Sequence, residues 1–224
     1  ITGGQILFHG EDITNYNERQ MRPLREKIQI IFQDPYASLN PKKKIVQSVM
    51  APLDVAGKYT KEEKLEKVRK ILREVGLSDK YLEKYPHEMS GGQRQRIVIA
   101  RALILEPKFI FCDEPVSALD VSVRAQVLNL MKDLQKEFNL TYMFISHDLS
   151  VVKFIADRVC VMFLGSVCEV GETKKLYDHP LHPYTRFLMN AIPKEDPHLR
   201  TKEKELLSGE IPSPVNPKSE GQAS

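Results

Sequence analysis

Met89-Ser90-Gly91-Gly92-Gln93-Arg94-Gln95-Arg96 is the stretch from which the fold of this chain is best inferred, and an apolar run from Ile97 to Ile104 follows it. Ser90 is a favourable helix N-cap, and the two glycines after it let the backbone approach a ligand closely. The N–H groups at such a helix start, together with the positive end of the helix dipole, bind anions. Gln93 and the arginines add side-chain donors at the same end. The alternative for this stretch is an ordinary flexible Ser-Gly-Gly loop.

A second segment, Phe109-Ile110-Phe111-Cys112-Asp113-Glu114-Pro115, is an apolar run that ends in two acids. Unbroken apolar residues predict a parallel strand that is covered on both faces. Side chains at the carboxyl end of such a strand face the crevice where ligands bind. Adjacent acids point in different directions, so one can hold a metal ion while the other addresses a water molecule. The alternative is a solvated strand end.

These two segments, in this order and at this distance, resemble the signature sequence and the Walker B strand of an ATP-binding-cassette (ABC) ATPase. The resemblance implies an α/β fold: a P-loop NTPase-like core with a parallel sheet and flanking helices, an inserted helical lobe and a C-terminal extension. It also implies that the chain works with ATP and Mg²⁺. The residues that match are Ser90, Gly91, Gly92 and Gln93 for nucleotide contact, Asp113 for Mg²⁺, and Glu114 as the base for the attacking water.

Three further motifs fit the same family. His147 follows the apolar run Thr141–Ile145 and matches the switch histidine, which contacts the γ-phosphate and orients the water. Gln33 follows Ile28–Phe32 and matches the Q-loop glutamine, which approaches Mg²⁺ and the water and couples that site to the transmembrane partner. Asp120 ends Ser117-Ala118-Leu119-Asp120 and matches the D-loop, which crosses the dimer interface. Taken singly, these residues are also a structural histidine, a turn glutamine and a helix cap.

In ABC proteins the signature faces the nucleotide that the opposite subunit holds, so two cassettes enclose two ATP molecules. ATP closes the dimer and hydrolysis releases it. The resemblance therefore implies that the output of the protein is a conformational cycle.

Composition excludes other classes of protein. The net charge is +3 and the pI is about 8.6, with Lys and Glu intermixed, so nothing favours a nucleic-acid partner. No apolar run approaches the roughly 18 residues that span a bilayer, so a membrane role must come through a partner. The three cysteines form no CxxC pair, and two lie in apolar strand-like runs, which predicts buried thiols in a reducing compartment.

Periodicity and turn signals predict the order of the elements. Strands are expected at residues 5–8, 28–32, 109–113, 141–145, 158–163 and 166–170, and residues 35–41 are expected to form a loop. Helices are expected after the capping box Thr60-x-x-Glu63 as far as Gly76, after Ser90, after Asp120, and over 149–156. We expect four parts: an incomplete N-terminal part of the core (1–33), a helical lobe with the signature at its end (34–100), a RecA-like core with Walker B, D-loop and switch histidine (101–170), and a C-terminal extension (171–224) with a mobile end from Ser208.

The P-loop pattern G-x-x-x-x-G-K-[ST], which cradles the β- and γ-phosphates, is absent from the 224 residues. Gly57-Lys58-Tyr59 contains the only Gly-Lys pair, and Pro52 stands where the first glycine should be. No upstream aromatic residue stands where it could stack on the adenine. Family members carry both features before the strand that begins here near Gln5, so we expect an N-terminal truncation. Such a chain should bind its own ATP poorly and present its signature to a partner's ATP.

Three segments narrow the family. Residues 32–41 (FQDPYASLNP), 85–90 (YPHEMS) and 179–185 (HPLHPYT), the last followed by Ala191-Ile192-Pro193, are similar to segments of the oligopeptide/dipeptide importer ATPases. The form of the first segment suggests the second of the two unlike ATPase subunits. The resemblance implies a motor subunit at the cytoplasmic face of the cell membrane. Its partners would be a second ABC ATPase subunit in a heterodimer, two transmembrane permease subunits and, indirectly, an extracytoplasmic peptide-binding protein.

Several alternatives stay open. Nickel, opine and glutathione importers share these motifs, so the substrate is not determined. Cassettes of DNA repair or translation usually add coiled coils or a second cassette, and neither pattern is visible. A non-catalytic half-site that only completes a partner's active site would also fit a chain without a P-loop.

Additional metal centres are not expected. Some relatives place an iron–sulfur cysteine cluster after a Pro-Ser-Pro segment, but no cysteine follows residues 212–214 here. A metal site formed by His179, His182 and Cys168 is disfavoured by the prolines beside them.

Overall fold

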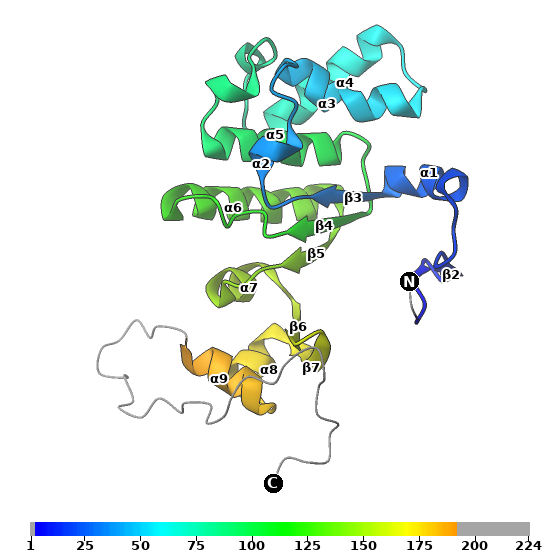
Figure 1. Ribbon diagram of the computed structural model, residues 1–224. Helices are drawn as coiled ribbons and strands as arrows, with labels where there is room; N and C mark the ends of the chain where they lie inside the picture. Colours follow the sequence, from blue (N-terminus) through cyan, green and yellow to red (C-terminus); the bar gives the residue numbers. More distant parts are fainter. Residues whose placement is uncertain (1–2, 192–224) are drawn as a thin grey trace. The chain divides into compact units, whose positions relative to one another are not determined.

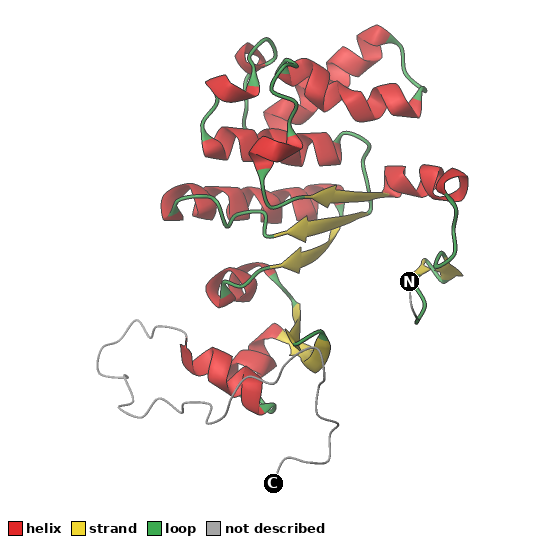
Figure 2. Ribbon diagram, viewed as in Figure 1, coloured by secondary structure: helices red, strands yellow, loops and turns green. Residues whose placement is uncertain are grey.

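The computed structural model describes residues 3–191 of the chain, which form two compact units. The first ends at His147 and the second begins at Asp148. Figure 1 follows the chain by colour and Figure 2 by secondary structure. The four-part division expected from the sequence is not tested by these units and stays a prediction.

A three-stranded parallel sheet forms the centre of the first unit. It consists of β3 (Ile28–Ile31), β4 (Phe109–Asp113) and β5 (Thr141–Ile145), in the order β3-β4-β5. Because Ile31 pairs with Cys112 and Asp113 pairs with Ile145, the carboxyl ends of all three strands meet at one edge. The predicted α/β fold with a parallel sheet is confirmed, as are these three strands.

The two faces of this sheet differ in burial. On one face Ile31, Ile110 and Cys112 are buried, and Tyr142 donates a hydrogen bond of 3.2 Å to the Met131 carbonyl of α6 (Val121–Phe138). On the other face Phe109 and Phe111 are only half-buried, and Ile30 and Met143 are more than 40% exposed. The expectation that 109–113 is covered on both faces is therefore wrong for the first unit, because its described residues bury only one face of the sheet.

Helix α5 (Gly91–Leu103) lies between the sheet and a pair of helices, α3 (Ile45–Ala56) and α4 (Lys61–Glu74), as Figure 1 shows. Its apolar residues are buried nearly all the way round: Ile97, Val98, Ile99, Ala100 and Leu103 are each at most 1% exposed. A helix that is apolar on all sides has to be enclosed by other elements. The run that follows the glycines in the sequence is therefore a core helix.

Helix α4 begins and ends where the sequence predicts. Thr60 accepts a hydrogen bond from the Glu63 N–H, and the Glu63 carboxylate accepts one from the Thr60 N–H. After the C-cap Val75, Gly76 takes a left-handed conformation with φ of +73°. Arg96 of α5 donates a hydrogen bond of 2.8 Å to the Val75 carbonyl, which satisfies one of the free acceptors at this helix end.

The segment 35–41 differs from its prediction. Residues Pro35–Ser38 form a short helix, α2, because Asp34 accepts a hydrogen bond from the Tyr36 N–H and proline suits the first helical position. The remaining elements of the first unit are β1 (Leu7–Phe8) and β2 (Glu11–Asp12), which pair antiparallel, α1 (Glu18–Lys27), and two 3₁₀ turns, η1 (Asp79–Tyr81) and η2 (Pro86–Glu88).

The second unit is built on the antiparallel pair β6 (Arg158–Phe163) and β7 (Ser166–Glu172), joined by the predicted turn at Gly165. Up to residue 191, this unit also contains the helices α7 (Leu149–Ile155), α8 (Thr173–Asp178) and α9 (Pro183–Ala191). Val159, Val161 and Leu176 form its buried cluster. The Glu169 carboxylate accepts hydrogen bonds of 3.0 Å from the N–H groups of Leu181 and His182, just before α9.

Two details of this unit correct or limit the sequence analysis. Cys160 is exposed and Cys168 half-buried, so the expectation of buried thiols holds only for Cys112, because alternate residues of β6 face outward. The predicted mobile end from Ser208, the Pro-Ser-Pro segment and Ile192-Pro193 lie outside the described residues. Within residues 3–191, the helices are all too short or too polar to cross a membrane.

Replacing Gly76 should destabilise the chain more than replacing a matched glycine. Gly57 ends α3 with φ of +68° and has open space around it, whereas a Cβ at Gly76 would lie 2.8 Å from the Arg96 guanidinium. Gly57→Ala should cost about 1–2 kcal/mol of left-handed strain. Gly76→Ala should cost about 1 kcal/mol more, because Arg96 must also give up its hydrogen bond to Val75. Urea unfolding of both variants measures the difference, and equal losses would contradict the role given to Arg96.

Candidate active site

Three predicted residues meet at the carboxyl edge of the sheet. Gln33 follows β3, Glu114 follows β4 and His147 follows β5. The Gln33 amide donates a hydrogen bond of 3.1 Å to Oε2 of Glu114, and Nδ1 of His147 lies 2.9 Å from Oε1 of the same carboxylate. Gln33 lies 81 positions before Glu114 in the sequence and His147 lies 33 positions after it, yet both contact the same carboxyl group.

The Glu114 backbone explains how its side chain reaches both neighbours. Its N–H donates to the Ile145 carbonyl at 3.0 Å, which extends the β4–β5 pairing by one residue. Its φ is then +45°, a left-handed conformation that is unfavourable for a residue with a Cβ. The N–H and hydroxyl of Ser117 both donate to the Glu114 carbonyl, at 3.2 and 3.0 Å, and stabilise this turn.

Asp113 lies beside this cluster with its carboxylate exposed, and no hydrogen bond or ion pair to it is found within residues 3–191. Gln33 uses its amide nitrogen on Glu114, which leaves its amide oxygen available. Carboxylate and amide oxygens, completed by water and phosphate oxygens, suit Mg²⁺. In the described part of the chain, no three His, Cys, Asp or Glu side chains gather as a metal site. The assignment of Asp113 and Gln33 as Mg²⁺ ligands stays a prediction.

The predicted anion site at the start of α5 has the expected cap. The Ser90 hydroxyl accepts from the Gln93 N–H at 3.3 Å, and the Gln93 side-chain oxygen accepts from the Ser90 N–H at 3.0 Å. This capping box leaves the N–H groups of Gly91 and Gly92, the first two residues of the helix, as donors. Such a donor set fits a phosphate group.

Gln93 and the arginines after the glycines donate hydrogen bonds within the fold, which the sequence did not predict. Arg94 donates to the Met89 carbonyl at 2.8 Å and lies over the Tyr36 ring. Arg96 donates to Val75. Gln93 uses its amide nitrogen to donate to the Tyr81 hydroxyl at 3.0 Å. These side chains hold α5 to its neighbours, because each of these donors already has a partner within the fold.

Asp120 caps α6 as predicted. Its carboxylate accepts from the Val123 N–H and from the Ser122 hydroxyl, both at 2.9 Å. The Val123 N–H bond, followed by the Ser122 bond, lowers the pKa of Asp120. The turn before it packs on the glycines: a Cβ at Gly91 would be 3.6 Å from the Leu119 side chain, and Gly92 is adjacent to Val123.

The predicted site residues therefore fall into two groups. One is Gln33, Glu114 and His147 with Asp113 next to Glu114, and the other is Ser90 to Gln93 with the turn that ends at Asp120. Within residues 3–191, no hydrogen bond or ion pair joins the first group to residues 90–93. The cofactor, catalytic and metal roles given to these residues stay predictions.

Sequence reasoning missed residues that act through the backbone. Ser117 stabilises the Glu114 turn, and Arg101 of α5 donates a hydrogen bond to the Ser38 carbonyl at the end of α2. Burial lowers the pKa of Arg101. An arginine within the otherwise apolar run 97–104 was the available signal, since a buried charge needs a partner.

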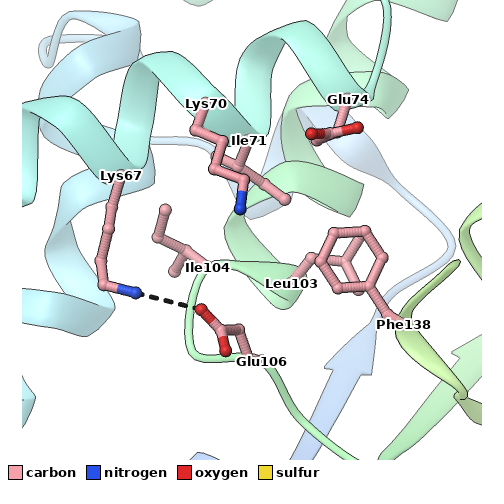
Figure 3. Close-up of a pocket in the computed structure, with 8 residues that line it drawn as sticks. All are labelled: Lys67, Lys70, Ile71, Glu74, Leu103, Ile104, Glu106 and Phe138. Carbon is pink, nitrogen blue, oxygen red and sulfur yellow. Dashed lines mark hydrogen bonds and ion pairs between the residues drawn. The ribbon is translucent and has the colours of Figure 1, made fainter.

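A small cavity opens elsewhere, between α4 and the C-terminal ends of α5 and α6 (Figure 3). Its volume is about 60 Å³, and it is lined by Lys70, Leu103, Phe138 and the ion pair Lys67–Glu106, among others. Ligand pockets usually enclose about 300–1,000 Å³. It contains none of the predicted site residues, and it is too small for a nucleotide.

Comparison with known proteins decides the family. The profile of the family described as "ABC transporter" matches residues 1–117, just over half of the chain. The chain belongs to the ABC transporter family. It is thus an ATPase of the ABC type. A second profile, described as "Oligopeptide/dipeptide transporter, C-terminal region", matches residues 168–221 of this ABC ATPase.

Curated relatives agree with this assignment. The oligopeptide transport ATP-binding protein AppF of Bacillus subtilis is 55% identical over 96% of this chain and 66% of its own length. The dipeptide transport ATP-binding protein DppF of Escherichia coli is 51% identical over 96% of this chain and 64% of its own length. The chain therefore spans about two thirds of the length of these two relatives.

Solved structures of ABC ATPases share the fold. The structure of cbiO1 from Clostridium perfringens, part of the ABC transporter complex cbiONQ, has a TM-score of 0.72 and 32% identity over 80% of this chain and 69% of that one. A dimeric ATP-binding cassette in a post-hydrolysis state, bound to ADP and Pi, has a TM-score of 0.67 and 27% identity over 77% of this chain and 74% of that one.

The Asp120 cap should make stability depend on pH in the acid range. Because the folded-state pKa of Asp120 is lowered, its ionised form stabilises the fold above the unfolded pKa of about 3.9, and this contribution is lost as the pH falls through the folded-state pKa. Asp120→Asn keeps a comparable cap without titrating. The stability advantage of the natural chain over this variant should shrink between about pH 6 and about pH 3. Thermal unfolding across the range tests this, with Asp133→Asn on the same helix as a charge control. A constant difference would contradict it.

Proposed function

We propose that this ABC ATPase is the ATP-hydrolysing motor subunit of an importer of dipeptides or oligopeptides. The observation that carries the catalytic part is the Glu114 carboxylate, held between Gln33 and His147 at the carboxyl edge of the sheet. The transport part is supported by the C-terminal match over residues 168–221 and by the peptide-transport names of the relatives.

Glu114 acts as the general base in this proposal. The contacts of its carboxylate with Gln33 and His147 fix its orientation. As a water oxygen attacks the γ-phosphorus, Glu114 accepts the water proton, the bond from phosphorus to the bridging oxygen breaks, and ADP leaves with the electron pair. The His147 side chain is 74% exposed, so its other ring nitrogen is accessible to the γ-phosphate. Mg²⁺ held by Asp113 and Gln33 would neutralise charge on the phosphate oxygens.

In this proposal, the first turn of α5 binds the nucleotide that the partner subunit holds. Its two free N–H groups and exposed N-cap Ser90 would contact the phosphates of an ATP held by a second ABC ATPase subunit, which suits a heterodimer that closes on ATP. Asp120 lies at the start of α6, beside this turn, where it would cross the same interface. The cycle of closure and release would drive two transmembrane permease subunits.

This proposal places the protein at the cytoplasmic face of the cell membrane, with an extracytoplasmic peptide-binding protein as an indirect partner. It needs no nucleic acid. Nickel, opines and glutathione are the competing substrates. Measuring the uptake of a labelled dipeptide by the assembled transporter, and comparing it with the uptake of each competing substrate, decides among them.

Replacing Glu114 should trap the ATP-bound state. In the transporter assembled from the complete natural subunits, with the expected P-loop, Glu114→Gln should slow hydrolysis at that site by roughly 10²–10⁴-fold, because the amide cannot accept the proton. ATP binding should persist, so closed dimers should accumulate in size-exclusion runs with Mg-ATP. Glu66→Gln, an exposed residue of α4, is the matched control. Normal turnover by the Glu114 variant would exclude its role as base.

Replacing Ser90 should affect the partner's site. Ser90→Arg removes the cap and fills the anion site at the start of α5, so hydrolysis of the ATP held by the second subunit should fall by about tenfold or more. Single-turnover measurements, with the catalytic base of one subunit disabled at a time, separate the two sites. Ser78→Arg adds the same charge at an exposed position. Unchanged hydrolysis at both sites would contradict the arrangement in trans.

A further inference from the structure

The second glycine of the α5 start has a packing role that the anion-binding motif does not explain. Gly92 is buried, while Ser90 before it is exposed. A Cβ placed on Gly92 would overlap Cγ1 of Val123 in the first turn of α6. A Cβ on Gly91 would meet only Leu119, at an ordinary contact distance of 3.6 Å. The two neighbouring glycines are therefore not equivalent.

Val123 cannot easily move aside. A valine in a helix has one strongly preferred χ1 rotamer, so its methyl groups are fixed relative to the backbone of α6. That backbone is itself fixed at this point, because the N–H of Val123 donates to the Asp120 cap. Any side chain at position 92 would therefore push the start of α5 away from α6.

The start of α6 is connected to the catalytic group of the same chain. Ser117 binds the Glu114 carbonyl, and the Leu119 N–H donates to the Val116 carbonyl at 3.3 Å. The turn then continues through Leu119, which packs beside Gly91, to Asp120 and Val123. The continuous segment 114–123 therefore connects the turn at Glu114 to the residues that pack against Gly91 and Gly92.

We infer that Val123 is a positioning residue for the glycine turn at the start of α5, and that Gly92 lacks a side chain because Val123 occupies that space. The inference rests on the proposed function in one respect, that the N–H groups of this turn contact the partner's ATP. Val123 then sets where those donors lie relative to Glu114. The segment 114–123 links the chain's own hydrolytic site to the surface that it offers to the other nucleotide.

The test is a cycle of variants: Gly92→Ala, Val123→Ala, the double variant, and Gly91→Ala. Alanine is the better helix former, so without a clash it should stabilise the start of α5. Gly92→Ala should instead lower the thermal unfolding midpoint of the chain by several degrees, whereas Gly91→Ala should leave it unchanged or raise it. Adding Val123→Ala to Gly92→Ala should recover most of the loss. If Gly92→Ala alone does not fold, the double variant must fold, and its failure would overturn the inference.

A second readout separates positioning from stability. In the assembled transporter, Gly92→Ala should raise the ATP concentration for half-maximal hydrolysis by roughly tenfold, because the displaced N–H groups no longer match the phosphate. The double variant should return it towards the natural value. A double variant that regains its unfolding midpoint but stays as impaired in ATP use as Gly92→Ala would show that the nucleotide, not Val123, excludes a side chain at position 92.

Failure of the proposed function gives a different pattern. If Ser90→Arg leaves hydrolysis at both sites unchanged, the contact in trans is wrong. The rescue of the unfolding midpoint by Val123→Ala would still decide whether Val123 and Gly92 compete for the same space.

Discussion

Burial of α5 on all sides is the constraint on which the first unit depends. The helix packs against α3 and α4 on one side and against the sheet on the other, and its apolar residues are almost completely excluded from solvent. Its polar side chains extend this packing, since Arg94, Arg96 and Arg101 donate to carbonyls on three other segments. The N-cap Ser90 is exposed at the start of the helix. A rigid, enclosed helix with one free end can present N–H donors without adjusting to a ligand.

The position of Glu114 depends on the parallel sheet. Parallel pairing brings the ends of three strands to one edge, and the left-handed turn at Glu114 directs its carboxylate between Gln33 and His147. Strained backbone of this kind persists only where the surroundings impose it. Here the extra hydrogen bond to Ile145 and the two from Ser117 impose it. The cluster of Gln33, Glu114 and His147 thus depends on β-sheet register and on one short turn.

The same turn leads on to the predicted anion site at the start of α5. In ten residues the chain passes from Glu114 to Val123, and it contacts both glycines of the α5 start on the way. An ABC dimer that uses two nucleotides needs each chain to respond to its own site and to its partner's. In the proposed dimer, a packed segment between the two groups of residues would meet that need more directly than a flexible loop, because its contacts join both groups.

The sequence by itself determined the elements whose signals are local. The capping boxes at Thr60 and Ser90, the Asp120 cap and the strand of 109–113 all depend on neighbours within a few residues, so their patterns are visible in one dimension. The family resemblance added Gln33, Glu114 and His147 as a functional set. Local signals failed at Pro35–Ser38, where the Asp34 cap outweighed the turn formers, and at Phe109 and Phe111, whose burial depends on what lies across the sheet.

Only the tertiary structure decided which side chains meet. The arginines after the glycines looked like anion donors, yet Arg94 and Arg96 donate to the carbonyls of Met89 and Val75, which no spacing rule could indicate. The difference between Gly91 and Gly92 is also invisible in sequence, because it arises from a valine 31 positions further along the chain. Short-range hydrogen bonding and periodicity depend on residues close together in the sequence and can be predicted from it, whereas contacts between distant segments depend on how the elements pack.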